Sequence, residues 1–138
     1  MSADIENLQR AIVSAIRAGV EDQDVAVAFS GGLDSGLVAA VAKDYARSVT
    51  LYTSGKDQSY DVVMAQDMSE RLGLPWLHIP ITKDNIEQRL REMISITRTS
   101  SPLTLSFELP LFFVCKTVHE KYILGGQGSD ELFYGYNK

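Results

Sequence analysis

The apolar positions of the chain follow two alternating patterns. Ile5, Leu8 and Ile12 recur at helical spacing and predict an amphipathic helix over residues 3–18. The run VAVAF at residues 25–29 is short and nearly continuous, which is typical of a strand covered on both faces. By the same criteria we predict further helices at 35–46, 60–72, 84–96 and 103–118, and further strands at 49–53, 76–79 and 122–124.

Strands that alternate with helices predict a doubly wound α/β fold with a parallel sheet, in a single domain over residues 1–138. We place the strand at 25–29 centrally, the second and third strands on one side of it, and the strand at 122–124 on the other. Ligands of such sheets bind at the switch point, outside the carboxyl ends of the strands. Because a glycine-rich loop follows each of the two strands at that point, we expect the two loops to meet.

Three local features refine these expectations. Pro110 should divide the last long helix, because proline removes a helical hydrogen bond. Asp84 should cap the helix before it. Cys115 follows an apolar run and should be buried.

The first loop reads Ser30-Gly31-Gly32-Leu33-Asp34-Ser35, between a strand and a helix. Its glycines let backbone N–H groups approach an anion, and the helix start adds donors and a partial positive charge. The serines add hydroxyl donors, but the loop lacks the lysine of a Walker loop. Asp34 would repel phosphate unless Mg²⁺ lay between them, so we interpret it as a metal ligand. The alternative is a glycine turn in which Asp34 or Ser35 caps the helix; both roles can coexist.

Composition narrows the function classes. The 138 residues are 45% hydrophobic and 22% charged, which suits one compact core. The net charge of −5 disfavours a nucleic-acid partner. One cysteine excludes an internal disulfide and a multi-cysteine zinc site. Without an apolar run that could span a bilayer or a signal-peptide core, we expect a cytoplasmic protein with no membrane partner.

The first loop resembles the SGGxDS signature of the ATP-pyrophosphatase (PP-loop) superfamily, whose fold is adenine nucleotide α-hydrolase-like. Asparagine, NAD and GMP synthetases and some tRNA-modifying enzymes share this loop. The resemblance implies that ATP is cleaved between its α and β phosphates, that an oxygen of the acyl substrate is activated as an adenylate, and that a nucleophile displaces AMP. It also implies that residues 30–35 bind the nucleotide, namely Ser30, Gly31, Gly32, Leu33, Asp34 and Ser35.

The second loop, LGGQGSDELFYGY at residues 124–136, resembles the asparagine synthetase signature S-G-E-G-A/S-D-E-L/V-F-G-G-Y. The segment RTSSP at 98–102 resembles the R-A-S-T-P segment of that family, and the resemblance covers residues 25–136. It implies that Asp130 acts with Asp34 as a catalytic Mg²⁺ ligand.

The same resemblance implies further nucleotide contacts. Gly125 and Gly126 would let the backbone approach the nucleotide, and Ala28 and Ser54 would touch the base or ribose through their main chains.

The sequence departs from the family in three places. Gln127 stands where asparagine synthetases have a glutamate that assists ammonia attack, and an amide cannot serve as that general base. Related enzymes that close β-lactam rings also vary at this position, so the residue here depends on which nucleophile accepts the acyl group. Gln127 therefore argues against asparagine as the product. Ser2 replaces the catalytic cysteine of the glutaminase domain, and Lys138 precedes the family's helical extension. We therefore expect either a fragment or a minimal relative that borrows the rest from a partner.

The leading interpretation is an ATP- and Mg²⁺-dependent, AMP-forming amide ligase domain of amino-acid biosynthesis. It would adenylate an aspartate-like small-molecule carboxylate before attack by an amine donor. A glutaminase or helical partner chain, or a second copy of this chain, would complete it. Two alternatives stay open: a nucleotide-binding module without full catalysis, and a tRNA-modifying PP-loop enzyme, against which the acidic charge and lone cysteine argue.

Overall fold

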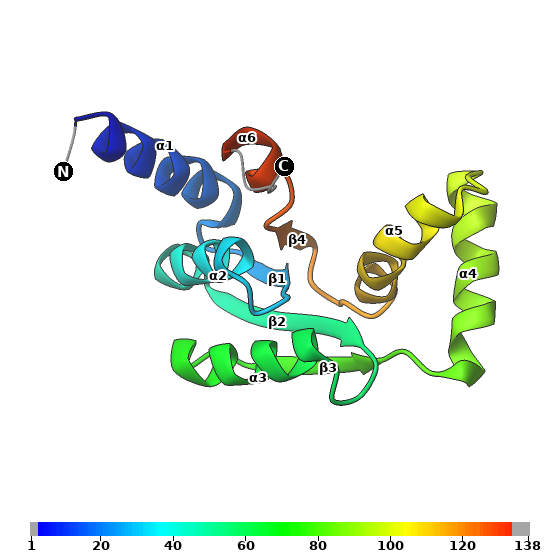
Figure 1. Ribbon diagram of the computed structural model, residues 1–138. Helices are drawn as coiled ribbons and strands as arrows, with labels where there is room; N and C mark the ends of the chain where they lie inside the picture. Colours follow the sequence, from blue (N-terminus) through cyan, green and yellow to red (C-terminus); the bar gives the residue numbers. More distant parts are fainter. Residues whose placement is uncertain (1–2, 134–138) are drawn as a thin grey trace.

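A computed structural model describes residues 3–133 of the chain (Figure 1). The last part of the second motif, residues 134–136, therefore lies outside the described residues. In chain order the elements are α1 (Ala3–Val20), β1 (Asp24–Ala28), α2 (Leu33–Tyr45), β2 (Ser48–Gly55), α3 (Tyr60–Leu72), β3 (Trp76–Pro80), α4 (Lys83–Thr97), α5 (Pro102–Cys115), β4 (Tyr122–Gly125) and α6 (Ser129–Phe133).

The four strands form one sheet in the order β3-β2-β1-β4, and every pair is parallel. Ala28, the last residue of β1, lies opposite Tyr52 of β2 on one side and Gly125 of β4 on the other. The predicted strand order is thus confirmed, with β1 central. The switch point lies between β1 and β4, so the loops that follow these strands leave the same edge of the sheet.

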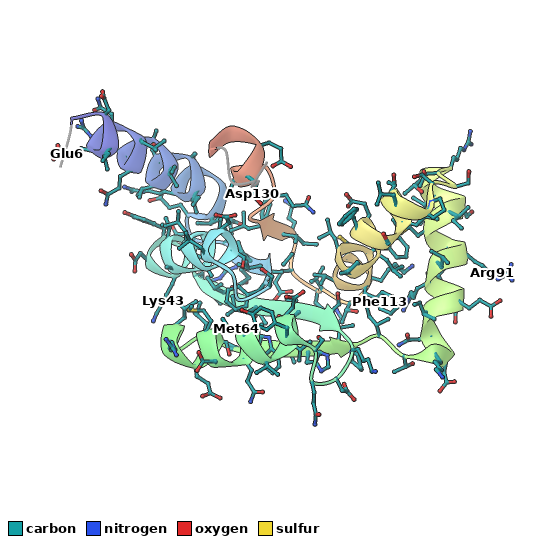
Figure 2. All side chains as sticks on the ribbon, in the orientation of Figure 1. Glu6, Lys43, Met64, Arg91, Phe113 and Asp130 are labelled. Atoms are coloured by element: carbon teal, nitrogen blue, oxygen red, sulfur yellow. The ribbon has the colours of Figure 1, made fainter. Side chains whose placement is uncertain are left out.

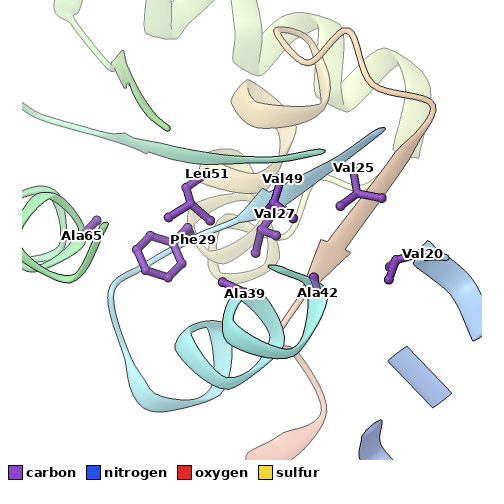
Figure 3. Packing of buried hydrophobic residues seen from close by; sticks show 9 residues of the cluster. All are labelled: Val20, Val25, Val27, Phe29, Ala39, Ala42, Val49, Leu51 and Ala65. Atoms are coloured by element: carbon purple, nitrogen blue, oxygen red, sulfur yellow. The ribbon is translucent and has the colours of Figure 1, made fainter. Parts of the chain in front are cut away.

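Helices cover both faces of the sheet, which confirms the doubly wound arrangement. Alternate residues of β1 point to opposite faces, so Val25 and Val27 join one core cluster and Ala26 joins the other. Side chains of α1, α2 and α3 complete the first cluster, and Figure 3 shows Ala39 and Ala42 of α2 beside Val27. Side chains of α4 and α5 complete the second, in which Phe113 of α5 (Figure 2) is 3% exposed.

A partly buried hydrogen bond lies on the second face. The hydroxyl of Tyr52 donates to the Glu120 carboxylate, at 3.0 Å from Oε2. Burial, with the adjacent carboxylate, raises the pKa of Tyr52 to about 12. Burial alone would raise the pKa of Glu120, but backbone N–H donors and the Tyr52 and Thr50 hydroxyls outweigh it and lower that pKa. The pair links β2 to the segment that leads into β4.

Two expectations about helix ends and breaks are wrong. α5 continues through Pro110, because the helical bond that proline removes belongs to the carbonyl of exposed Ser106, where water can replace it. α4 begins after Thr82 rather than at Asp84, since the Thr82 amide donates to the Asn85 side chain at 2.9 Å.

The expectation that Cys115 is buried is also wrong, because its side chain is exposed. The buried face of α5 repeats every four residues at Leu105, Leu109 and Phe113, and Cys115 lies away from it. Across the described residues, no helix has both the length and the apolar character needed to cross a membrane.

Candidate functional site

The loop that joins β1 to α2 turns directly into the helix. α2 begins at Leu33, and Gly32 precedes it with an extended backbone, φ −73° and ψ 171°. The Gly32 carbonyl already accepts from the Gly36 amide at 2.9 Å. Asp34 and Ser35 therefore lie within the first turn of α2, and the alternative in which either residue is the N-cap is wrong. The first-turn N–H groups face the loop as an anion site requires.

The two serines of the loop bond to each other and to its backbone. The Ser30 amide lies 3.3 Å from the Ser35 hydroxyl oxygen, and the two hydroxyl oxygens are 3.2 Å apart. The Gly32 amide donates to the Ser30 hydroxyl at 3.3 Å. Because Ser35 is only 5% exposed, its hydroxyl maintains the shape of the loop from within, while Ser30 remains exposed.

Gly31 lies directly on helix α3. Its φ is +75°, and a Cβ at this position would stand 2.6 Å from both the Ala65 nitrogen and the carbonyl carbon of Met64 (Met64 is labelled in Figure 2). A contact this short does not occur in real side chains. The positive φ would also strain any residue other than glycine. Glycine thus lets the loop rest on the α3 backbone.

The second loop, which joins β4 to α6, packs against the first. A Cβ on Gly126 would stand 2.8 Å from the Ser35 amide nitrogen and 2.9 Å from the Asp34 Cβ. The Ser129 hydroxyl donates to the Gly126 carbonyl at 3.0 Å and steadies the turn into α6. Figure 2 shows Asp130 near the start of that short helix. The two loops therefore form one surface, as the predicted topology implies.

A cleft of about 1180 Å³ opens over this surface at the carboxyl ends of the strands. It is large enough for a nucleotide. All but one of the sequence-predicted site residues line it: Ala28, Ser30, Gly32, Leu33, Asp34, Ser35, Ser54, Gly125, Gly126, Gln127 and Asp130. Gly31 is buried against α3 instead and shapes the loop from below.

The charged residues that line the cleft are all acidic. They are Asp34, Asp61, Glu108, Asp130 and Glu131, and the described lining includes no lysine, arginine or histidine. A polyphosphate could bind there only with a cation between the charges. Oxygen ligands suit Mg²⁺, which takes one or two carboxylates and completes its shell with phosphate oxygens and water. Over residues 3–133 no group of three or more metal-ligating side chains occurs. The cleft does offer the carboxylates of Asp34 and Asp130, and two carboxylates are enough for a Mg²⁺ ion that also binds phosphate oxygens.

Sequence reasoning missed several residues of the cleft. Asp61 lies in the first turn of α3, after β2, and the rule that sites lie at the carboxyl ends of strands could have found it. Phe107, Glu108 and Leu111 of α5 form another wall. No motif signals that wall, because it depends on how α5 packs on the sheet.

The family model described as asparagine synthase matches residues 6–138 of the chain. A putative glutamine-hydrolyzing asparagine synthetase of Methanocaldococcus jannaschii is 30% identical over 135 residues, which are 95% of this chain and 25% of that protein. A glutamine-hydrolyzing asparagine synthetase of Bacillus subtilis is 31% identical over 120 residues, 84% of this chain and 19% of that protein. The chain thus spans a quarter or less of the length of these relatives.

Solved structures show the same fold at low identity. The NH3-dependent NAD synthetase of Campylobacter jejuni superposes with a TM-score of 0.59 at 19% identity, over 96% of this chain and 61% of that one. The NMN synthetase of Francisella tularensis gives a TM-score of 0.62 at 16% identity, over 96% and 58% of the two chains. These neighbours bear out the predicted PP-loop, adenine nucleotide α-hydrolase-like fold. With the family model covering nearly its whole length, the chain belongs to the asparagine synthase family.

Proposed function

We propose that this chain is the nucleotide-binding part of an AMP-forming amide ligase, which activates a small carboxylate at the expense of ATP. One observation above all supports the proposal. The loops after β1 and β4 touch at Gly126, and both Asp34 and Asp130 line the cleft above the contact. A site with two carboxylates beside the first turn of a helix suits a polyphosphate that arrives with Mg²⁺.

In this proposal the first loop binds the β and γ phosphates. The backbone N–H groups of the first turn of α2, after Gly32, supply donors without a lysine. The Ser30–Ser35 hydrogen bonds hold these donors in place before the ligand arrives, which lowers the reorganisation that binding would require.

Asp34 and Asp130 would hold Mg²⁺ against the phosphate oxygens from two different elements, α2 and α6. When bound, Mg²⁺ would neutralise the charge that develops on the departing pyrophosphate. Asp34 belongs to the first turn of the 13-residue helix α2, so the dipole of that helix also stabilises its charge.

The adenosine would lie over the ends of β1 and β2, near Ala28 and Ser54. The Ser54 hydroxyl donates to the Pro110 carbonyl at 2.7 Å, which ties β2 to α5. With its side chain occupied in this way, Ser54 would recognise the nucleotide through its main chain.

The proposed reaction has two halves. A substrate carboxylate oxygen attacks the α phosphorus of ATP, pyrophosphate leaves, and an amine then displaces AMP from the acyl-adenylate. Gln127 is exposed on the same cleft and can orient an amine by hydrogen bonding, but it cannot take its proton. We therefore propose that a partner chain, or a longer protein of which this chain is part, supplies the amine and the base.

Gln127 also favours a second candidate, a nucleotide-binding module that lacks the acceptor half of the reaction. The two candidates differ in turnover. The ligase releases AMP and pyrophosphate when the right carboxylate is present, whereas the module binds Mg-ATP without cleaving it.

Exchange of labelled pyrophosphate into ATP tests the ligase proposal. A panel of amino-acid carboxylates is tried with the chain alone and with candidate partner chains, and Asp34→Ala serves as the inactive control. We expect exchange that requires one carboxylate and is lost in the variant. If no carboxylate supports exchange under any of these conditions, the ligase proposal is wrong.

A further inference from the structure

Two hydrogen bonds in series connect the edge strand β3 to the end of the central strand β1. The indole Nε1 of Trp76 donates to the hydroxyl of Thr53 on β2 at 2.9 Å. The Thr53 hydroxyl lies 2.6 Å from the carbonyl oxygen of Phe29, immediately after β1. Neither bond belongs to the ladders between strands.

The direction of this relay is fixed by chemistry. An indole N–H can only donate and a carbonyl can only accept, so the single hydroxyl proton of Thr53 must point to Phe29. Thr53 is 3% exposed, which keeps water from replacing either bond. Although Thr53 borders the cleft, its hydroxyl proton is therefore committed to the carbonyl of Phe29.

The relay holds the backbone just after the last residue of β1 that pairs with β2. The paired residues of β1 and β2 end at Ala28 and Tyr52, and the Phe29 amide still donates to the Tyr52 carbonyl at 2.8 Å. The next peptide joins the carbonyl of Phe29 to the amide of Ser30. Because a peptide is planar, holding the carbonyl also fixes the direction of the Ser30 N–H.

That N–H is the first group of the phosphate loop. It points to the Ser35 hydroxyl at 3.3 Å, and the Ser35 hydroxyl in turn contacts Ser30. Rotation of the Phe29–Ser30 peptide would break this bond and move the first amide of the loop. The two hydrogen bonds thus position the loop through the Phe29–Ser30 peptide, without contacting the ligand themselves.

Trp76 is itself held in place. Its ring stacks on His78, with 6.0 Å between ring centroids and 4° between planes. His78 Nε2 lies 3.0 Å from the Gly55 carbonyl at the end of β2. These contacts position the indole relative to β2 independently of its hydrogen bond to Thr53.

From this geometry we propose that Thr53 and Trp76 are positioning residues for the phosphate loop, set by the relay from Trp76 through Thr53 to Phe29. The proposal rests on the proposed function, since it assumes that the loop binds Mg-ATP. It adds two residues outside both loop motifs to the machinery of that site.

The test compares Thr53→Val, which keeps the shape but removes the hydroxyl, with Thr53→Ser, which keeps the hydroxyl. The readouts are the dissociation constant of Mg-ATP by calorimetry and the fluorescence of Trp76, the only tryptophan of the chain. We expect Thr53→Val to weaken binding about tenfold, the effect of roughly one lost hydrogen bond, and Thr53→Ser to restore most of it. The Trp76 emission should shift in the valine variant and stay unchanged in the serine variant.

Ser69→Ala is the matched control. Like Thr53, Ser69 is a buried hydroxyl residue, with 4% exposure, but it lies on α3. Its hydroxyl donates to the Gln66 carbonyl at 2.7 Å and not to the phosphate loop. It should lose stability without losing affinity for Mg-ATP. This separates a general loss of stability from a displaced loop.

Four outcomes would overturn the inference. Wild-type affinity in Thr53→Val, or equal losses in the valine and serine variants, would contradict it and leave the proposed function intact. No binding of Mg-ATP by the wild-type chain would overturn both. If Thr53→Val does not fold, Trp76→Phe decides: it removes the N–H donor, and affinity equal to wild type would contradict the relay.

Discussion

Gly126 of the second loop lies so close to Ser35 of the first that a Cβ would stand 2.8 Å from the Ser35 amide nitrogen. The two residues are far apart in the sequence and meet because β1 and β4 are adjacent parallel strands. The amide at this contact belongs to the first turn of α2. The spacing of the two loops, and with it the distance between Asp34 and Asp130, thus depends on a glycine at this position.

Gly126→Ala should separate the loops. We expect affinity for Mg-ATP to fall about tenfold or more, because the added methyl group can be accommodated only by moving the backbone of one loop. The free energy of unfolding should change less, since the second loop lies at the end of the sheet. Calorimetric titration with Mg-ATP measures the first quantity and urea denaturation the second.

Gly19→Ala is the control for that experiment, because a Cβ there would have no atom within 4 Å. It should bind Mg-ATP as the wild type does. Equal affinity in Gly126→Ala and Gly19→Ala would show that the loop contact is not part of the binding site.

Gly31→Ala should destabilise the whole fold. A positive φ of 75° costs a side chain about 1–3 kcal/mol, and the contact with the α3 backbone adds to this. We expect urea denaturation to show a loss of about 2 kcal/mol or more in the free energy of unfolding. Gly36→Ala, in open space within α2, should instead gain about 0.5–1 kcal/mol. A Gly31→Ala protein as stable as the wild type would mean that the loop does not rest on α3.

The partly buried Tyr52–Glu120 pair predicts a particular dependence of stability on pH. The folded protein holds the Tyr52 proton to about pH 12, whereas the unfolded chain releases it near pH 10. The free energy of unfolding should therefore fall as pH rises from 10 towards 12. The pKa of Glu120 is lowered on folding, so this carboxylate stabilises the folded protein at neutral pH. That contribution to the free energy of unfolding is lost as pH falls below the usual glutamate range.

Tyr52→Phe tests this pair. Removing the hydroxyl should cost about 1.5–3 kcal/mol at neutral pH, the scale of a hydrogen bond to a charged group, and should flatten the alkaline dependence. Tyr60→Phe is the matched control, because Tyr60 is 77% exposed. Denaturation curves from pH 7 to about 11 compare the three proteins. An unchanged alkaline slope in Tyr52→Phe would assign that slope to other groups.

Cys115 is exposed and lines the cleft, so it should react with a thiol reagent in the folded protein. Mg-ATP should slow the reaction if the nucleotide fills the cleft. Mass spectrometry of the labelled chain follows the rate. Labelling at the same rate with and without saturating Mg-ATP would mean that the ligand binds elsewhere.

The strand order, and most element boundaries to within two residues, could be predicted from the sequence, because apolar runs separated by amphipathic helices leave few topologies. The helix at Tyr60–Leu72 was predicted with its observed limits. The same reasoning placed both loops at one edge of the sheet. Local rules failed at Pro110 and Cys115, where the outcome depended on which side of α5 faces the sheet.

The relay through Thr53 and Trp76 could not be predicted for a related reason. The two residues lie in different strands, and neither belongs to a motif. Their contact depends on the register of β2 against β3, in which Leu51 lies opposite Trp76. A sequence pattern predicts that these strands are neighbours but does not set the register between them.

Calorimetric binding of ATP with and without Mg²⁺ tests the central claim most directly, when Asp34→Asn, Asp130→Asn and the double variant are compared with the wild-type chain. If the two carboxylates hold one ion against the phosphates, the wild type should bind ATP tightly only with Mg²⁺. Each single variant should then lose about tenfold or more of that gain, and the double variant little more than either single one. Equal ATP affinity with and without Mg²⁺, or wild-type affinity in both single variants, would contradict the account.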